Sequence, residues 1–264
     1  MNPSTKRNQK AGLCTLVGAG PGDPELLTIK AVRAIGSATV LLVDDLVNMD
    51  IVTAYAHPDA RVVSVGKRGG CASTPQAFIE KMMISAAKEG EHVVRLKGGD
   101  PFIFGRGGEE LAHLEAAGVR VAVVNGITAG LAAVTSLGVP LTHREHAHGV
   151  IFVTGHAKPG DEGTDWAQLA ITARDAKLTL VIYMGVRGVR SIQRQLLAGL
   201  PGSMPVAVIQ NASLPSQQQA LCTLANLEQT ITRKKMGSPS VIVVGNVMKG
   251  LLALQQTGDQ VKTA

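Results

Sequence analysis

The residues best suited to chemistry lie in a run of charges and glycines between positions 97 and 110. Asp100 carries a carboxylate that can accept hydrogen bonds from hydroxyl or amine groups, and Arg106 carries a planar guanidinium whose geometry suits carboxylates. Glu109 stands three residues after Arg106, so an ion pair within one helical turn is an equally good interpretation of that arginine. The run therefore predicts either a site for an acidic ligand or a local salt bridge.

Glycine is unusually dense in the same run, with five glycines in the eleven residues from Gly98 to Gly108. Glycine lets a ligand approach the backbone closely but weakens the fold through lost conformational entropy, so this density favours a binding loop over an ordinary surface loop. Two more glycine-containing turns, 18–24 and 125–130, also follow predicted strands. Since parallel strands end at one edge of a sheet, we expect the three turns to line one crevice.

The turn 18–24 raises the alternative of a nicotinamide dinucleotide. Its glycines follow GxGxG rather than GxGxxG, Pro21 removes a backbone donor, and Asp23 brings negative charge to the place where a diphosphate would bind. In favour of this alternative, Asp44 ends the second predicted strand, where a ribose-binding acid would stand. A nicotinamide-dependent oxidoreductase therefore stays a minor alternative.

These turns belong to a repeated pattern of apolar strand, glycine-containing turn and helix, which predicts an α/β fold. The predicted strands are 13–18, 39–44, 61–65, 92–96, 120–124, 150–154, 178–183, 206–209 and 241–244. One predicted helix has Thr74 as N-cap, Pro75 as its first residue and Gly90 as its stop, with a buried stripe of Phe78, Met82, Met83 and Ala86. Another predicted helix spans 108–117.

The segment 138–149 interrupts this pattern, and we place the domain boundary there. Residues 13–137 then form an N-terminal α/β domain with glycine-rich loops and 149–250 a C-terminal α/β domain, while 1–10 and 255–264 are expected to be flexible tails. The segment holds His143, His146 and His148, but with no cysteine and only Glu145 as a neighbouring carboxylate we predict no metal site.

The composition narrows the class of function. Lys and Arg number 26 against 20 for Asp and Glu, a formal charge of +6 that agrees with an acidic ligand. Aromatic residues are only 3% and are not interleaved with basic runs, so we expect no nucleic-acid partner. No apolar run approaches the roughly 18 to 20 residues of a membrane span, which predicts a soluble, cytoplasmic protein without a membrane partner.

Four stretches carry a resemblance to a known family: Val17–Thr28, Val65–Arg68, Arg95–Glu110 and Val153–His156. They resemble the uroporphyrinogen-III C-methyltransferases of the tetrapyrrole methylase family, and the likeness runs in order from Leu13 to Met248. The resemblance implies two α/β domains with a cleft between them, usually as a homodimer. It also implies S-adenosylmethionine in that cleft, with S-adenosylhomocysteine as the product.

The implied reaction is methylation of uroporphyrinogen III at carbon, by way of precorrin-1, to precorrin-2 for siroheme, cobalamin or haem d1. Some members carry a dehydrogenase and ferrochelatase module ahead of the methyltransferase, whereas about a dozen residues precede the first predicted strand here. We therefore expect this chain to pass precorrin-2 to other enzymes. Enzymes of the same fold that methylate later corrin precursors, a diphthamide intermediate or ribosomal RNA are the nearest alternatives.

The resemblance also assigns roles to single residues. Cofactor contacts are carried over to Pro21, Gly98, Gly99, Asp100, Ile103, Thr128, Ala129, Met184 and Ala212. Asp44 and Lys67 correspond to the proton acceptor and donor, and Arg106 and Glu109 to a pair associated with the tetrapyrrole. Lys67 and His156 are further candidates for substrate binding, although a methionine such as Met184 after an apolar run is also typical of a core.

Three residues are candidates for the group that removes the proton: Asp44, Asp45 and Arg106. The family commonly has Tyr before the aspartate and a non-acidic residue after it, whereas Asp44 stands between Val43 and Asp45. Arg106 is chemically awkward as a base because the pKa of a guanidinium lies above about 12, so we interpret it as a clamp for substrate carboxylates.

Overall fold

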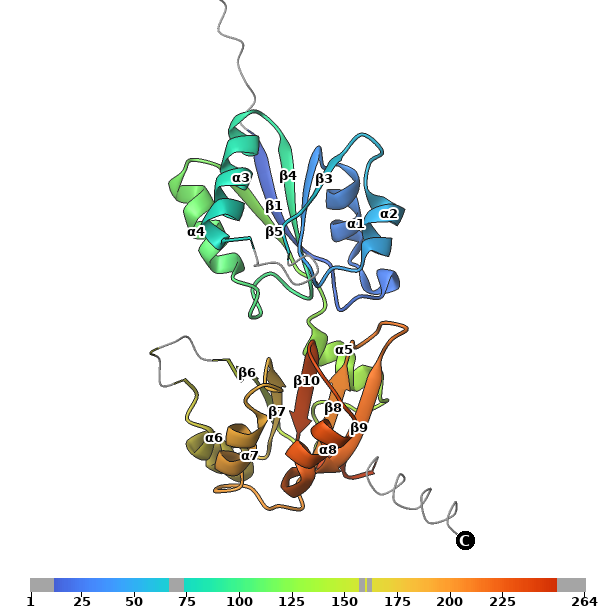
Figure 1. Ribbon diagram of the computed structural model, residues 1–264, viewed down its shortest axis with the longest axis vertical. Coiled ribbons are helices and arrows are strands. Elements are labelled where there is room, and N and C mark those ends of the chain that lie inside the picture. Colours follow the sequence, from blue (N-terminus) through green and yellow to red (C-terminus); the bar gives the residue numbers. More distant parts are fainter. Residues whose placement is uncertain (1–11, 67–73, 157–159, 161–162, 251–264) are drawn as a thin grey trace, which may run out of the picture. The chain divides into compact units, whose positions relative to one another are not determined.

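The computed structural model describes residues 12–66, 74–156, 160 and 163–250. The chain divides between Thr128 and Ala129 into two units, each built on a five-stranded sheet (Figure 1). Helices cover both faces of each sheet, which confirms the predicted α/β class.

The first sheet is parallel throughout, in the order β3-β2-β4-β1-β5. Its strands are β1 (Leu13–Gly18), β2 (Val40–Val43), β3 (Arg61–Ser64), β4 (His92–Lys97) and β5 (Arg120–Val124). All four residues of β2 are buried because helices cover both faces of the sheet. The predicted strands agree with these bounds to within one residue at either end.

Two helices cover each face of the first sheet (Figure 1). One face carries α1 (Ile29–Gly36) and α2 (Met49–Tyr55), preceded by the short η1 (Pro24–Leu26), and the other carries α3 (Gln76–Lys88) and α4 (Gly107–Ala116). The predicted burial of Phe78 on α3 is wrong, because this side chain is 55% exposed. The buried stripe follows Ile79, Met83 and Ala86, and Phe78 lies about 100° around the helix from Ile79.

The second sheet has the order β6-β7-β10-β8-β9. Its strands are β6 (Gly149–Thr154), β7 (Leu178–Tyr183), β8 (Pro205–Gln210), β9 (Gln218–Thr223) and β10 (Ser240–Val244). β6 runs parallel to β7, and β7 and β8 are both antiparallel to β10, so β6, β7 and β8 end at one edge. The sequence did not predict β9, whose first residues, Gln218 and Gln219, are polar and exposed.

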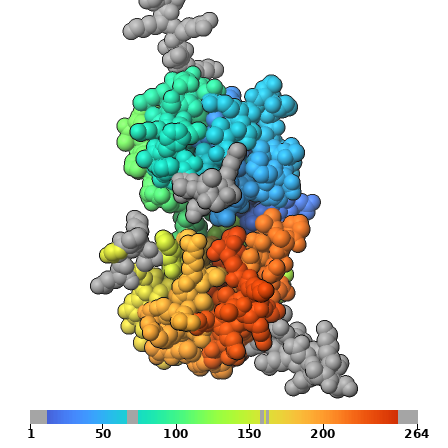
Figure 2. Space-filling model, in the orientation of Figure 1, coloured from blue at the N-terminus to red at the C-terminus, as the bar shows by residue number. Residues whose placement is uncertain are grey.

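One face of the second sheet packs against α6 (Trp166–Asp175), α7 (Val189–Leu196) and α8 (Leu227–Arg233), and the other packs against α5 (Ala129–Thr135). Short helices η2 (Leu224–Asn226) and η3 (Asn246–Met248) complete the unit. In the space-filling view, side chains fill the spaces between the ribbons of each unit (Figure 2). Among the helices of the described residues, none has the length and apolar character that crossing a membrane requires.

Helix α5 belongs to the second unit. Ala133 and Val134 pack with Val181 and Val243 of the second sheet, and the amide of Gly130 donates a hydrogen bond of 2.8 Å to the Tyr183 hydroxyl. The sequence instead predicts that residues 129–137 continue the first domain. The difference arises because the apolar face of α5 is complementary to a sheet formed later in the chain, which the local βα pattern does not reveal.

We predict that Tyr183→Phe destabilises the second unit by about 1–3 kcal/mol. Gly130 is buried in the first turn of α5, where no helical carbonyl can accept from its amide, so the exchange leaves this donor unsatisfied. Urea unfolding followed by the fluorescence of Trp166, the single tryptophan, reports on this unit. Tyr55→Phe on α2 is the matched control; an unchanged midpoint for Tyr183→Phe would contradict the packing of α5.

Candidate functional site

Three loops meet at the carboxyl edge of the first sheet, after β1, β4 and β5. The amide of Gly20 donates to the Gly99 carbonyl at 3.1 Å, and the amide of Gly99 donates to the Gly20 carbonyl at 2.7 Å. A Cβ at Gly126 would lie 2.1 Å from the Gly99 carbonyl oxygen, and a Cβ at Gly18 would lie 2.5 Å from the Gly126 nitrogen. Glycine is therefore required where these loops touch.

The buried carboxylate of Asp100 joins the second and third loops. Its Oδ1 accepts from the Phe102 amide at 2.8 Å, and its Oδ2 accepts from the Asn125 side-chain amide at 3.2 Å and the Gly126 amide at 3.1 Å. The sequence predicts that Asp100 accepts hydrogen bonds from a ligand. In the structure, at least three of its acceptor positions are used to hold the loops together.

The segment after β2 also depends on glycines of neighbouring loops. A Cβ at Gly98 would lie 2.7 Å from the Cβ of Leu46, and one at Gly66 would lie 2.4 Å from the Cβ of Asp45. Of the glycines from which the sequence predicts a binding loop, Gly98 is thus required by its contact with the neighbouring segment, and Gly105 and Gly107 by close contacts with Pro101 of their own loop. Ligand binding by these loops stays a prediction.

Asp44 and Asp45 lie in different surroundings, although they are adjacent. The Asp44 side chain is 28% exposed, its Oδ1 accepts from the Asp45 amide at 3.1 Å, and its Oδ2 forms an ion pair of 3.6 Å with Nη2 of Arg95. Asp45 is exposed. Asp44 is therefore held by the buried side chain of Arg95, whereas Asp45 faces solvent.

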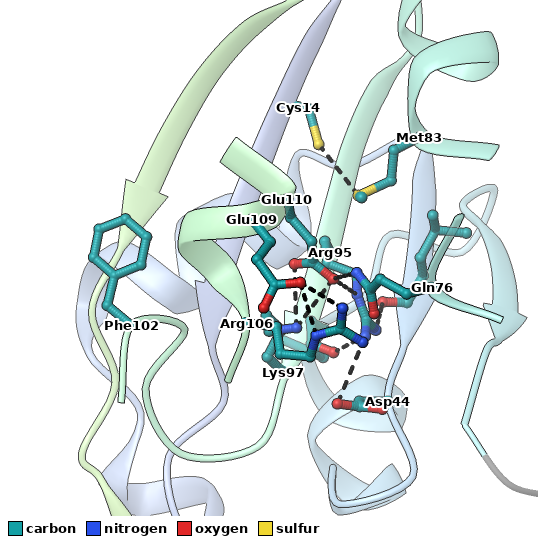
Figure 3. Close-up of polar contacts among 12 residues, drawn as sticks. Cys14, Asp44, Gln76, Met83, Arg95, Lys97, Phe102, Arg106, Glu109 and Glu110 are labelled. Atoms are coloured by element: carbon teal, nitrogen blue, oxygen red, sulfur yellow. Dashed lines mark hydrogen bonds and ion pairs between the residues drawn. The ribbon is translucent and has the colours of Figure 1, made fainter. Parts of the chain in front are cut away.

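A cluster of buried charges lies on the interior side of Asp44, between β4 and the helices α3 and α4 (Figure 3, above Asp44). Oε1 of Glu110 accepts from Nε of Arg95 at 3.2 Å, from Nζ of Lys97 at 3.1 Å and from Nε2 of Gln76 at 2.9 Å. The side chain of Glu110 is fully buried, and those of Arg95 and Lys97 are nearly so. These four residues are called the buried charge cluster below.

Burial at the buried charge cluster shifts the pKa of two groups. Burial, followed by the charge of Arg95, lowers the pKa of Lys97, although Glu110 opposes the shift. Burial and the negative charge of Glu110 raise the pKa of the Cys14 thiol to about 12. Charges in such an environment must be paired, because removing one partner typically destabilises a protein by about 3–5 kcal/mol.

Arg106, the N-cap residue of α4, forms an ion pair with Glu109 in the first turn of that helix, as the local alternative predicts (Figure 3). Both side chains are about half exposed, and Arg106 adopts a left-handed backbone conformation with φ of 59°. The hydrogen bonding that the Arg106 guanidinium donates to the Glu109 carboxylate raises the pKa of Arg106 above its usual value. Arg106 therefore stays cationic and is unsuited to removing a proton.

The predicted cofactor residues and the substrate candidate His156 are distributed over the two units. Pro21, Gly98, Gly99, Asp100, Ile103 and Thr128 lie in the three loops of the first unit. In the second unit, His156, Met184 and Ala212 follow β6, β7 and β8 at one edge of the sheet, and Ala129 begins α5. Lys67, also a substrate candidate, lies outside the described residues.

The alternative that Met184 is a core residue is wrong. Its side chain is 48% exposed and its backbone is left-handed, with φ of 54°. Ala212 is buried, whereas His156 is exposed and its amide donates to Oγ1 of Thr154 at 3.1 Å. These surroundings leave Met184 and His156 accessible to a ligand from solvent.

Three side chains of the segment 138–149 lie close together. One ligand atom each from His143, Glu145 and His146 falls within 4.8 Å of the others. However, Nδ1 of His143 already accepts from the Glu145 amide at 3.2 Å, and the rings of His143 and His146 stack with centroids 4.6 Å apart. The prediction that the chain holds no metal stays a prediction.

The buried charge cluster was not predicted from the sequence. The signal was present in β4, where Arg95 and Lys97 alternate with Val94 and Leu96 and so point to one face of a buried sheet. Two cations in a strand covered on both faces require an acidic partner. Glu110 could have been sought on a covering helix from this signal alone.

A family model described as Tetrapyrrole (Corrin/Porphyrin) Methylases matches residues 14–228. The chain belongs to this family. The resemblance noted from the sequence motifs is thereby confirmed, and the tetrapyrrole methylases use S-adenosylmethionine.

Individual relatives cover nearly the whole chain. A uroporphyrinogen-III C-methyltransferase of Pseudomonas aeruginosa is 48% identical over 244 residues, which are 92% of this chain and 97% of the relative. A siroheme synthase 2 of Aeromonas hydrophila is 45% identical over 90% of this chain but only 50% of its own length. A crystal structure of a uroporphyrin-III C-methyltransferase from Thermus thermophilus, complexed with S-adenyl homocysteine, is 38% identical, with a TM-score of 0.75 over 90% of this chain and 93% of that one.

We predict that Asp100→Asn loosens the loop assembly of the first unit by about 1–3 kcal/mol. The exchange keeps the size of the side chain but turns an NH2 group toward an amide donor, whichever way the new side chain is oriented. Hydrogen exchange should become faster at the amide of Gly126 or of Phe102, whichever faces the new NH2 group. Asp59→Asn, at a side chain that is 93% exposed, is the control; unaltered exchange at both amides would show that Asp100 does not hold the loops.

Proposed function

We propose that this chain transfers methyl groups from S-adenosylmethionine to carbon atoms of uroporphyrinogen III, giving precorrin-2 by way of precorrin-1. The observation that supports this most directly is the 48% identity with a uroporphyrinogen-III C-methyltransferase over 97% of that relative's length. Support from the structure comes from the loop assembly at the carboxyl edge of the first sheet, the usual ligand position in open α/β sheets.

The first loop favours S-adenosylmethionine over a dinucleotide. A diphosphate would bind amides at the start of a helix, but Oδ1 of Asp23 already accepts from the Glu25 amide at 2.9 Å at the start of η1. A cofactor with a sulfonium and no phosphate meets no such repulsion. The predicted contacts from Pro21, Gly98, Gly99 and Ile103 would surround it with backbone and apolar groups.

The chemistry needs positioning more than charge. When bound, S-adenosylmethionine supplies an electrophilic methyl group on a cationic sulfur, and a neutral carbon attacks it, so charge is dispersed as the bond forms. Holding the reactants in line can contribute up to about 7–11 kcal/mol. Loops fixed to one another through Gly99, Asp100 and Gly126 are suited to this task because their backbones are held at short range.

A proton must also leave the substrate as the methylated ring system rearranges. Asp44 is the base in this proposal, since its carboxylate is partly exposed at the sheet edge and Arg106 is held as a cation by Glu109. Arg106, Glu109, Lys67 and His156 would bind polar arms of the substrate, with the guanidinium of Arg106 matching a carboxylate. A substrate carboxylate would then compete with Glu109 for Arg106.

The proposal also covers the pathways that use the product, the oligomeric state and the cellular location. The siroheme synthase relative supports siroheme synthesis as a route that uses the product, and cobalamin and haem d1 synthesis would use the same precorrin-2. We also propose a homodimer in the cytoplasm, as the family resemblance implies. The enzymes that consume precorrin-2 would be its downstream partners.

The decisive experiment is to incubate the protein with uroporphyrinogen III and labelled S-adenosylmethionine and to count the added methyl groups by mass. Two additions are expected, and a product without added methyl groups would overturn the proposal. Thermal-shift measurements with S-adenosylhomocysteine and NADP provide a second comparison. Stabilisation by NADP alone would instead support the nicotinamide-dependent alternative.

Substitutions at adjacent carboxylates test the base. We predict that Asp44→Asn lowers kcat by about 10²- to 10⁴-fold, the usual contribution of a general base, and that Asp45→Asn changes it little. Single-turnover methyl transfer measures both variants. Full activity of Asp44→Asn together with a slow Asp45→Asn enzyme would assign the proton transfer to Asp45.

Substitution of Arg106 separates a clamp from a base. As a clamp, Arg106→Lys keeps the positive charge but loses two-point binding of a carboxylate, so KM for uroporphyrinogen III should rise about tenfold while kcat is largely kept. Steady-state kinetics over a range of uroporphyrinogen III concentrations measures both constants. If kcat collapses while KM is unchanged, Arg106 takes part in the chemical step.

A further inference from the structure

Arg95 is held at several points by the interior of the first unit. Its Nε donates to Oε1 of Glu110 at 3.2 Å, and its Nη1 donates to the carbonyl oxygens of Leu42 at 3.4 Å and Leu96 at 3.5 Å. The guanidinium is planar and rigid, so these contacts also fix the direction of Nη2. That nitrogen lies 3.6 Å from Oδ2 of Asp44 (Figure 3).

Burial separates the roles of the two side chains. The Arg95 side chain is 3% exposed, so it cannot reach a substrate, whereas the Asp44 side chain is 28% exposed at the sheet edge. Asp44 is also fixed through its other oxygen, which accepts from the Asp45 amide. Any effect of Arg95 on a reacting group must therefore pass through a neighbour such as Asp44.

The charges of the buried charge cluster also link Arg95 to Asp44. Arg95 and Lys97 are two cations and Glu110 is one anion, and all three are almost completely buried. A surplus buried charge is unfavourable unless it is paired, and the Asp44 carboxylate completes the balance at the surface end of the cluster. The position of the Asp44 carboxylate thus depends on the buried charges of Arg95, Lys97 and Glu110.

We propose that Arg95 is a positioning residue for methyl transfer. It holds the Asp44 carboxylate in the orientation for proton removal, while Glu110 anchors the guanidinium on the interior side. This inference rests on the proposed role of Asp44 as the base. It assigns to Arg95 an effect on the rate of the chemical step and little effect on substrate or cofactor binding.

Kinetics of Arg95→Met, alone and combined with Asp44→Asn, test the proposal. Methionine fills similar space and leaves Lys97 and Glu110 as a balanced pair. We expect kcat to fall about 100-fold, as when a reacting group is misplaced by roughly 1 Å, with KM values and the Kd of S-adenosylhomocysteine within about twofold. In the Asp44→Asn background the same exchange should have no further effect on kcat.

Two more variants keep the test decisive. Arg95→Lys keeps a cation for Glu110 but lacks the branched guanidinium that reaches Asp44, so it should show the same loss of kcat if Arg95→Met does not fold. Arg190→Met on α7 of the second unit, which removes an exposed ion pair with Glu228, is the matched control, with kcat expected to stay within about twofold.

The outcomes separate this inference from the proposed function. An unchanged kcat in Arg95→Met or Arg95→Lys, or an equal loss of kcat from Arg95→Met with and without Asp44→Asn, would overturn the positioning role even if Asp44 is the base. If the unaltered protein does not methylate uroporphyrinogen III, or if Asp44→Asn is fully active, the proposed function or its base fails first.

Discussion

The close approach of three loop backbones at the carboxyl edge of the first sheet is the constraint on which the candidate site depends. Gly18 and Gly126 lie so close to each other and to the Gly99 carbonyl oxygen that neither has room for a Cβ atom, and Asp100 ties the second and third loops together. The loops can therefore present backbone groups at fixed positions without a bound ligand to order them. For a reaction that depends mainly on alignment, such prior order is the main contribution a protein can make.

Beneath that edge, electrostatics provides a second constraint. The buried charge cluster links β4, α3 and α4, and it reaches the surface at Asp44. Glu110 follows Glu109 on α4, so the same helical turn supplies the buried anchor for Arg95 and the exposed ion pair with Arg106. The buried charge cluster and the predicted substrate-binding surface thus share the first turn of α4.

Much of the first unit could be predicted from the sequence because its signals are local. Continuous apolar runs mark the strands of a sheet covered on both faces, and glycines mark the turns that follow them. The contacts of these turns could not be predicted, since Gly18, Gly99 and Gly126 come together only in the folded sheet. For the same reason Asp100 is predicted as a ligand contact although most of its hydrogen bonds go to the loops, and α5 is predicted on the wrong side of the division between units. The ion pair of Arg106 with Glu109 could be predicted because the two residues are only three positions apart in the sequence.

A crystal structure with S-adenosylhomocysteine bound would test most directly whether this loop assembly is the site of methyl transfer. The account predicts that the ligand lies against the residues around Gly20 and Gly99, with the contact between these two glycines and the ion pair of Asp44 with Arg95 preserved. Ligand density elsewhere on the chain, or loops that separate to admit it, would contradict the claim that backbone contacts build the site in advance.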